Sequence, residues 1–157
     1  MDHAVTATSS MASSGTLQRI VLATAIAGTL DILAAVGMTL YFGRPVAGML
    51  RYVASGPLPG ATGMGTAGAV LGLVVHFTLM AIMASVFVLA ADRMPMLKEK
   101  AIIWGVVYGV VTYVVMNLIV VPLRFATAFP PSTLSIVSQL TFHILLVGIP
   151  IALVAKR

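Results

Sequence analysis

The sequence predicts an all-α integral membrane protein, folded as a bundle of four transmembrane helices, and three observations support this prediction. Of its 157 residues, 60% are hydrophobic and only 8% are charged, whereas soluble domains contain about 25% charged residues. The apolar residues form four runs, each long enough to cross a bilayer as a helix. The nine Lys and Arg residues lie near the ends of these runs or in the connections between them.

The chain begins with a segment, residues 1–16, that is rich in Ser, Thr and Ala and has no periodicity. We expect a disordered cytoplasmic tail here, followed by a single transmembrane domain over residues 17–157. The first span is expected at 17–42, with Asp31 as the acidic residue inside it. A cleaved signal peptide is the alternative, but this apolar core is about twice the usual 7–15 residues. An uncleaved helix is therefore favoured.

The longest connection, residues 43–66, is expected to hold a short helix that lies in the outer membrane interface. Pro45 suits a first helical position, and apolar residues then recur at helical spacing as far as Ser55. Residues 63–68 match the G-x-G-x-x-G pattern of dinucleotide-binding loops. That pattern needs a preceding strand, and none is indicated, so we interpret the match as a flexible lead into the next helix.

The remaining spans are expected at 67–91, 101–123 and 134–155, and the short connections between them predict an up-down-up-down bundle. Two of these spans carry glycines at four-residue spacing, which places the glycines on one helix face. Small residues on such a face let helices approach closely inside a membrane. The predicted helix-packing residues are Gly68, Gly72, Gly105 and Gly109.

The distribution of cationic residues predicts the orientation of this bundle. With a cytoplasmic N-terminus, the inner ends hold six cationic residues, namely Arg19, Arg93, Lys98, Lys100, Lys156 and Arg157. The outer connections then hold three, which are Arg44, Arg51 and Arg124. This excess on the inner side follows the positive-inside rule, so we expect both termini to be cytoplasmic.

Each predicted span carries strongly polar side chains at a similar depth in the outer half of the membrane. At a rise of 1.5 Å per residue, the depths of Asp31, His76, Asn117 and His143 agree within roughly 6 Å, and Tyr113 and Gln139 lie about one turn away. The spans would therefore bring their polar groups into one layer. The residues of this predicted polar layer are Asp31, His76, Tyr113, Asn117, Gln139 and His143.

The leading functional hypothesis is proton-linked movement of a small solute or ion. An ionised carboxylate such as that of Asp31 costs roughly 3 kcal/mol at the centre of a span. Asp31 must therefore be protonated, paired with a histidinium or hydrated. An Asp–His pair can exchange a proton near physiological pH. This property suits a proton-coupled carrier.

Two alternatives stay open. In the first, the polar layer only holds the helices together, and the protein is a structural or accessory membrane subunit. In the second, His76 and His143 bind a b-type haem, or methionines near the layer, namely Met38, Met80, Met83 and Met116, bind Cu(I). We predict no metal and no cofactor. An enzyme is not favoured, because the sequence contains no Ser-His-Asp order and no H-E-x-x-H motif.

The expected partner is the lipid bilayer. A nucleic-acid partner is not expected, because the cationic residues mark helix ends rather than one face of the protein. The glycine faces could also pack between chains, so a homo-oligomer or a partner in a membrane complex stays open. The chain has no Cys, which excludes disulfides and thiolate metal sites.

Several short motifs over residues 67–157 resemble the YagU-like family of small bacterial inner-membrane proteins. These motifs are His76-Phe77, the turn Met94-Pro95-Met96-Leu97-Lys98, Gly105 to Gly109, Pro122-Leu123, Pro130-Pro131, His143 and the basic end Lys156-Arg157. The resemblance implies a multi-pass protein of the bacterial inner membrane that is linked to acid tolerance. It implies no catalytic residues.

Overall fold

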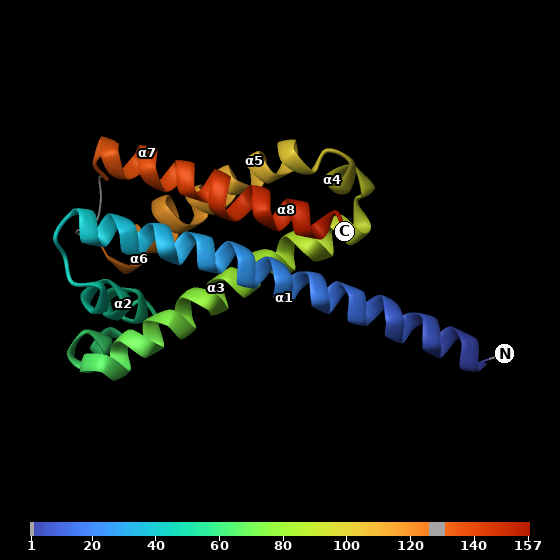
Figure 1. Ribbon diagram of the computed structural model, residues 1–157, viewed down its shortest axis with the longest axis horizontal. Helices are drawn as coiled ribbons and strands as arrows, with labels where there is room; N and C mark the ends of the chain where they lie inside the picture. The colour runs from blue at the N-terminus through green and yellow to red at the C-terminus, as the bar shows by residue number, and fades with distance from the viewer. Residues whose placement is uncertain (1, 126–130) are drawn as a thin grey trace.

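The structure is a computed structural model that describes the backbone of residues 2–125 and 131–157 and the side chains of residues 15–125 and 131–157 (Figure 1). Pro130, one of the residues in the family resemblance, lies outside the described residues. All regular elements within these ranges are helices: α1 (Asp2–Tyr41), α2 (Val46–Ala54), the 3₁₀-helix η1 (Pro59–Gly63), α3 (Gly65–Arg93), α4 (Pro95–Glu99), α5 (Ala101–Tyr113), the π-helix η2 (Val114–Val120), α6 (Val121–Arg124), α7 (Thr133–Phe142), the π-helix η4 (His143–Gly148) and α8 (Ile149–Ala155).

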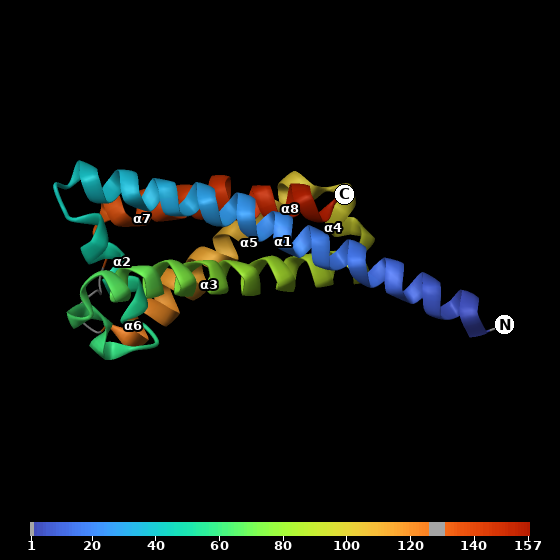
Figure 2. The same cartoon turned by 60° about the horizontal axis from the view of Figure 1, so that its bottom comes forward.

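Four helical segments are long and apolar enough to cross a membrane, which confirms the predicted number of spans. They are Gly15–Tyr41, Gly65–Arg93, Ala101–Arg124 and Thr133–Ala155. Each lies within a few residues of the range expected from hydrophobicity. All four segments are packed together in one bundle (Figure 2).

The third and fourth candidate spans each contain a π-helical stretch that the sequence did not predict. The stretch Val114–Val120 ends two residues before Pro122, and His143–Gly148 ends two residues before Pro150. Proline has no N–H and its ring collides with the carbonyl four residues earlier. The wider π turns, with bonds from residue i to i+5, accommodate both prolines without ending either helix.

The N-terminal segment differs from the prediction. Helix α1 begins at Asp2, so residues 2–16 are helical rather than a disordered tail. Residues 4–14 contain more Ser and Thr than Ala, and Gly15 follows them at the start of the first span, so local helix propensity is low here. The helix continues from the turns already formed in the first span, because extending a helix avoids the cost of nucleating one. In both views this end of α1 projects beyond the other helices (Figures 1 and 2).

Helix α2 is present where a short helix was expected, and it packs against α3. Its side chains Leu50 and Ala54 are buried. A methyl group on Gly72 would collide with the backbone of Leu50, and one on Gly68 would collide with the carbonyl oxygen of Ala61. These two glycines are therefore in contact with the connection that precedes α3.

The glycines of α5 allow a second close approach, this time between two candidate spans. A methyl group on Gly109 would collide with the carbonyl oxygen of His143, and one on Gly105 would lie 2.8 Å from Cα of Ile149. From the opposite side, Gly148 lies directly against the backbone of Gly105 and Gly109. All three glycines are buried, so the third and fourth spans pack backbone against backbone.

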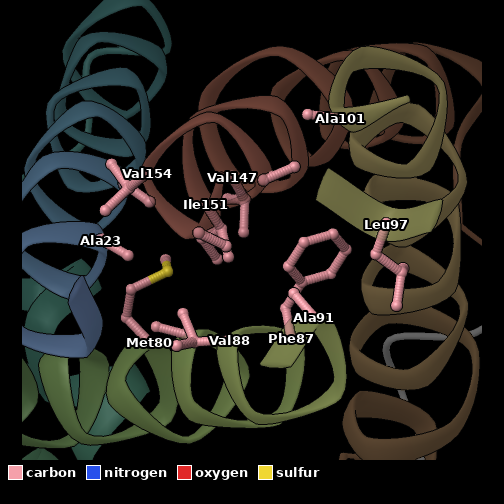
Figure 3. Close-up of a cluster of buried hydrophobic side chains, with 14 residues drawn as sticks. Ala23, Met80, Phe87, Val88, Ala91, Leu97, Ala101, Val147, Ile151 and Val154 are labelled. Atoms are coloured by element: carbon pink, nitrogen blue, oxygen red, sulfur yellow. The ribbon is translucent and has the colours of Figure 1, made fainter. Parts of the chain in front are cut away.

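One end of the bundle, which we call the Arg19 end, is filled by a cluster of 14 buried apolar side chains. The cluster combines Met80, Phe87 and Val88 of α3 with Val147 of η4 and Ile151 of α8 (Figure 3). Val88, Val147 and Ile151 are almost completely inaccessible. This part of the interior is therefore tightly packed and apolar.

A network of charges ties the helices together at the same end. Asp92 Oδ2 lies 2.9 Å from a guanidinium nitrogen of Arg19, and Asp92 Oδ1 lies 2.7 Å from Lys98 Nζ. The Thr16 hydroxyl also donates to Asp92, and Arg19 donates to the carbonyl oxygen of Ala155. These contacts join α1, α3, α4 and α8.

Candidate functional site

Five of the six residues of the predicted polar layer line one cavity of about 200 Å³ between the candidate spans. They come from all four candidate spans: Asp31 from α1, His76 from α3, Asn117 from η2, Gln139 from α7 and His143 from η4. Tyr113 does not line the cavity. It is buried, and its ring lies edge-on to that of His143 with the centroids 6.0 Å apart.

The orientation of His76 is set by the backbone of the first span. Nε2 of His76 lies 2.9 Å from the carbonyl oxygen of Gly28. Because a carbonyl oxygen only accepts hydrogen bonds, Nε2 must carry the hydrogen and donate it. In a neutral imidazole the other nitrogen, Nδ1, then presents a lone pair.

That second nitrogen faces the carboxylate of Asp31. Nδ1 of His76 lies 4.0 Å from Oδ2 of Asp31, and the two side chains are 11% and 22% exposed. A lone pair facing a carboxylate is unfavourable in a partly dehydrated site. A hydrogen between them, from a proton on either group or from a water molecule, makes the arrangement favourable.

His143 is held in a comparable way. Its Nδ1 lies 2.9 Å from the backbone carbonyl oxygen of Gln139, so Nδ1 donates and Nε2 is free to accept a proton. Its side chain is buried and lines the same cavity as Asp31 and His76. Asp31 is therefore flanked by two histidines, each with one nitrogen bonded to backbone.

Gly28 belongs to the candidate site, and the sequence did not indicate this. Its carbonyl oxygen orients His76, and a methyl group on Gly28 would collide with the ring of Phe77. The signal available in the sequence was a small residue three positions before Asp31, on nearly the same face of the helix. That signal predicts close packing and does not identify a hydrogen-bond acceptor.

A second cavity, of about 460 Å³, lies at the opposite end of the bundle from Arg19, and we call this the Arg44 end. Exposed Arg44 and the hydroxyl residues Thr39, Ser132, Ser135 and Ser138 contribute to its lining. We call this cavity the vestibule. The residues that line both the vestibule and the polar cavity are Ala35, Met49 and Gln139.

The vestibule and the polar cavity are therefore adjacent, and these shared side chains lie between them. Polar groups continue across this boundary, because Gln139 belongs to both linings. In the other direction the polar cavity is followed by the buried apolar cluster, with Met80 and Val147 common to the cavity lining and the cluster. The cavity is thus more accessible from the Arg44 end than from the Arg19 end.

The residues of the polar cavity do not fit a haem. Its volume of about 200 Å³ is below the roughly 300–1,000 Å³ of pockets for drug-sized ligands. Both nitrogens of His76 are already oriented by Gly28 and Asp31.

Three methionines of the proposed copper set, Met80, Met83 and Met116, line the polar cavity, whereas Met38 lines the vestibule. A flexible thioether side chain fills irregular apolar space well, and Met80 belongs to the buried apolar cluster. We assign these side chains to packing.

The fold and its surface define the class of the protein, an all-helical membrane protein with four candidate spans. Large apolar side chains on all four spans are more than half exposed, for example Leu33, Val74, Ile102 and Val137. Soluble proteins rarely expose apolar surface on this scale.

No protein-family model, curated protein or solved structure matches the chain. Membership of the YagU-like family therefore stays a prediction based on the short motifs.

Proposed function

We propose that the protein couples protonation of Asp31 and its flanking histidines to the movement of a small solute or ion across a membrane. The observation that carries this proposal is the relation between Asp31 and His76. One nitrogen of His76 is committed as a donor to Gly28, and the other faces the carboxylate at 4.0 Å. In this proposal Asp31 and His76 share one proton, and His143, which lines the same cavity, offers that proton another acceptor.

Access to the pair is the second part of the proposal. The solute enters from the Arg44 end through the vestibule, whose lining of hydroxyl groups suits water and small polar molecules. Gln139 and Met49 lie at the boundary with the polar cavity. Met49 belongs to α2, so a displacement of α2 would widen this entrance.

Release on the other side requires a rearrangement at the Arg19 end. There the apolar cluster and the charge network around Asp92 close the bundle. A carrier must expose its site to one side at a time, and a packed region that opens in alternation provides this. We propose that the present arrangement is the state accessible from the Arg44 end.

The proposed setting is the bacterial inner membrane, with an up-down-up-down bundle and both termini in the cytoplasm. The excess of cationic residues at the Arg19 end supports this orientation. The Arg44 end then faces the periplasm, where protons are available under acid stress. This setting agrees with the acid-tolerance link that the family resemblance implies.

The structural alternative is supported by a specific observation. Both His76 and His143 bond to backbone carbonyl oxygens, and the bond from His76 joins two candidate spans. Such bonds contribute on the order of 1 kcal/mol each to the packing of membrane helices. In this alternative the protein is an accessory subunit and the polar layer moves no proton.

Proton entry into sealed vesicles separates the two functions. Purified protein is reconstituted into vesicles that contain the pH-sensitive dye pyranine, and an inside-negative potential is imposed with potassium and valinomycin. We expect acidification with wild type and none above empty vesicles with Asp31→Asn. Glu99→Gln, which removes an exposed acid, is the matched control and should behave as wild type. Equal rates for wild type, Asp31→Asn and empty vesicles would contradict the proposal.

A further inference from the structure

A third cavity, of about 540 Å³, forms a groove on the outside of the bundle between α2, α3 and the segment from η2 to α6. Its sides are apolar, with Val53 from α2, Val75 and Leu79 from α3, and Met116 and Val120 from η2. Val120 is 42% exposed, so the groove opens on the apolar surface of the candidate spans. We call it the lateral groove.

Arg124 lies at one end of the lateral groove, beside Phe125. Its Nε donates to the carbonyl oxygen of Gly56 and a terminal nitrogen donates to that of Ser55, both at 2.8 Å. Its guanidinium carbon also lies 5.0 Å above the ring of Phe125. These contacts fix the position of the guanidinium group with respect to the groove.

The positive charge of Arg124 has no acidic partner in the described part of the chain, where all the ion pairs involve Asp31 or Asp92. Both of its hydrogen-bond acceptors are neutral carbonyl groups, which occupy two of the five N–H donors of a guanidinium group. Arg124 is exposed. It can therefore bind an anion with its remaining donors.

Tyr52 lies at the same end of the groove but is not an anionic partner for Arg124. Its ring stacks on that of Phe125, with the centroids 4.4 Å apart. Burial raises the pKa of Tyr52 above its ordinary value of 10.0, although the charge of Arg124 opposes this shift. The phenol is therefore neutral at physiological pH, and Arg124 is the charged group at this end of the groove.

We propose that the lateral groove binds an acyl chain of a phospholipid and that Arg124 binds the phosphate of the same molecule. The two features are positioned for one amphiphile, because the groove extends on the order of 12 Å along the third span, from Arg124 to Met116. Its apolar sides match a hydrocarbon chain, and the guanidinium group matches a phosphate. A phosphate without a chain would use only the Arg124 end, and a neutral lipid only the apolar sides.

The bound chain would also lie against the polar cavity. Four residues line both the lateral groove and the polar cavity, namely Val53, Leu79, Met116 and Val121. A hydrocarbon chain in the lateral groove would exclude water from the outer side of these four side chains, while their inner side faces the polar cavity. The lipid site is independent of any proton movement, so it stands or falls separately from the proposed function.

Native mass spectrometry of the full chain tests the proposal. Delipidated protein in detergent is mixed with phosphatidylglycerol and washed, and the mass of the protein with its retained lipid is measured. We expect one retained lipid per wild-type chain, and about tenfold weaker retention for Arg124→Gln, the loss expected for one charge-assisted contact. Val75→Trp should also lose the lipid, because the indole fills the groove.

The matched controls for both variants lie on α3, outside the lateral groove. Val74 is exposed on α3 outside the lateral groove, so Val74→Trp should retain the lipid. Arg93 is exposed and bonds to a carbonyl of its own helix, so Arg93→Gln should do the same. If Arg124→Gln does not fold, Arg124→Lys tests whether the positive charge binds the phosphate. This variant keeps the charge and should retain most of the lipid.

Two further ligands separate the sources of binding. Glycerol phosphate carries the head group alone and diacylglycerol carries the chains alone, and we expect neither to be retained. Diacylglycerol bound as well as phosphatidylglycerol, or glycerol phosphate bound by itself, would overturn the proposal. So would a wild-type protein that retains no lipid, or a Val75→Trp variant that retains as much as wild type.

Discussion

The imidazole of His76 and the carboxylate of Asp31 face each other across 4.0 Å, and the far nitrogen of the imidazole is bonded to the backbone of the helix that carries Asp31. Both contacts of His76 are thus with α1. The hydrogen bond to Gly28 fixes which nitrogen is the donor. The remaining nitrogen faces the acid at a distance longer than a hydrogen bond. A small approach of the two side chains would let them share a proton.

The first prediction concerns His76→Gln. Glutamine can still donate to the Gly28 carbonyl, but it cannot accept a proton towards Asp31. We expect proton entry into pyranine-loaded vesicles to fall to the level of empty vesicles, while the helix content measured by circular dichroism is unchanged. Undiminished proton entry by a folded variant would assign the layer to packing.

The second prediction concerns water access and uses the absence of cysteine from the chain. Ser138 lines the vestibule, whereas Ala84 is completely buried in the apolar cluster. We expect Ser138→Cys to react with a water-soluble maleimide within minutes and Ala84→Cys to stay unreacted until the protein is denatured. Labelling is measured by the mass increase, and rapid reaction of both would show that the Arg19 end is open.

The third prediction concerns the charge network at the Arg19 end. Asp92→Asn removes the ion pairs of Asp92 with Arg19 and Lys98. Because these side chains are partly exposed, we expect a loss of only about 1 kcal/mol in stability. The larger effect should be on the opening of the Arg19 end to water, so that Ala84→Cys becomes reactive in the Asp92→Asn background. Glu99→Gln at the same end should leave Ala84→Cys protected.

The fourth prediction concerns the backbone contact between the third and fourth spans. Gly109→Ala would place a methyl group against the carbonyl of His143, whereas Gly37→Ala would meet no atom within 4 Å. We expect the first variant to lose about 1–3 kcal/mol, the usual cost of overpacking, and the second to be as stable as wild type. Unfolding in detergent by circular dichroism measures both, and equal stability would refute the close contact.

The fifth prediction concerns orientation. A phosphatase reporter, which is active only outside the cytoplasm, is inserted after residue 58 or fused after Arg157. We expect activity from the insertion at residue 58 and none from the C-terminal fusion, because the Arg19 end carries the larger positive charge. Activity of the C-terminal fusion would reverse the proposed orientation and place the vestibule in the cytoplasm.

The positions of the four candidate spans could be predicted because apolar residues run without interruption for the thickness of a membrane. The meeting of Asp31, His76, Asn117, Gln139 and His143 in one cavity could be expected for a related reason. Once helices cross a layer of fixed thickness, counting residues from the helix ends gives the depth of each side chain. Depth is therefore the coordinate that the sequence provides.

Rotation about each helix axis is harder to predict, and the unexpected features depend on it. Tyr113 lies one turn from Asn117, but it packs on His143 instead of lining the cavity. Gly72 has the spacing of a residue between spans, but its partner is Leu50 in α2. Helical residues 2–16 were also missed, because the polarity of a segment says little about whether an existing helix continues through it.

The two π-helical stretches have a consequence for how this chain can vary. Because each π turn contains about one residue more than an α turn, deleting one residue from Val114–Val120 could convert this stretch towards a regular α-helix. A π turn rotates less per residue than an α turn, so six α-helical residues turn the chain by about as much as seven π-helical ones. The residues after such a deletion, Arg124 among them, would keep their direction around the helix axis. A deletion in the α-helical part of the same span, Ala101–Tyr113, would instead turn Arg124 by about 100° away from Ser55 and Gly56. Relatives with a one-residue gap in Val114–Val120 would therefore keep the lateral groove, and those with a gap in Ala101–Tyr113 would lose it.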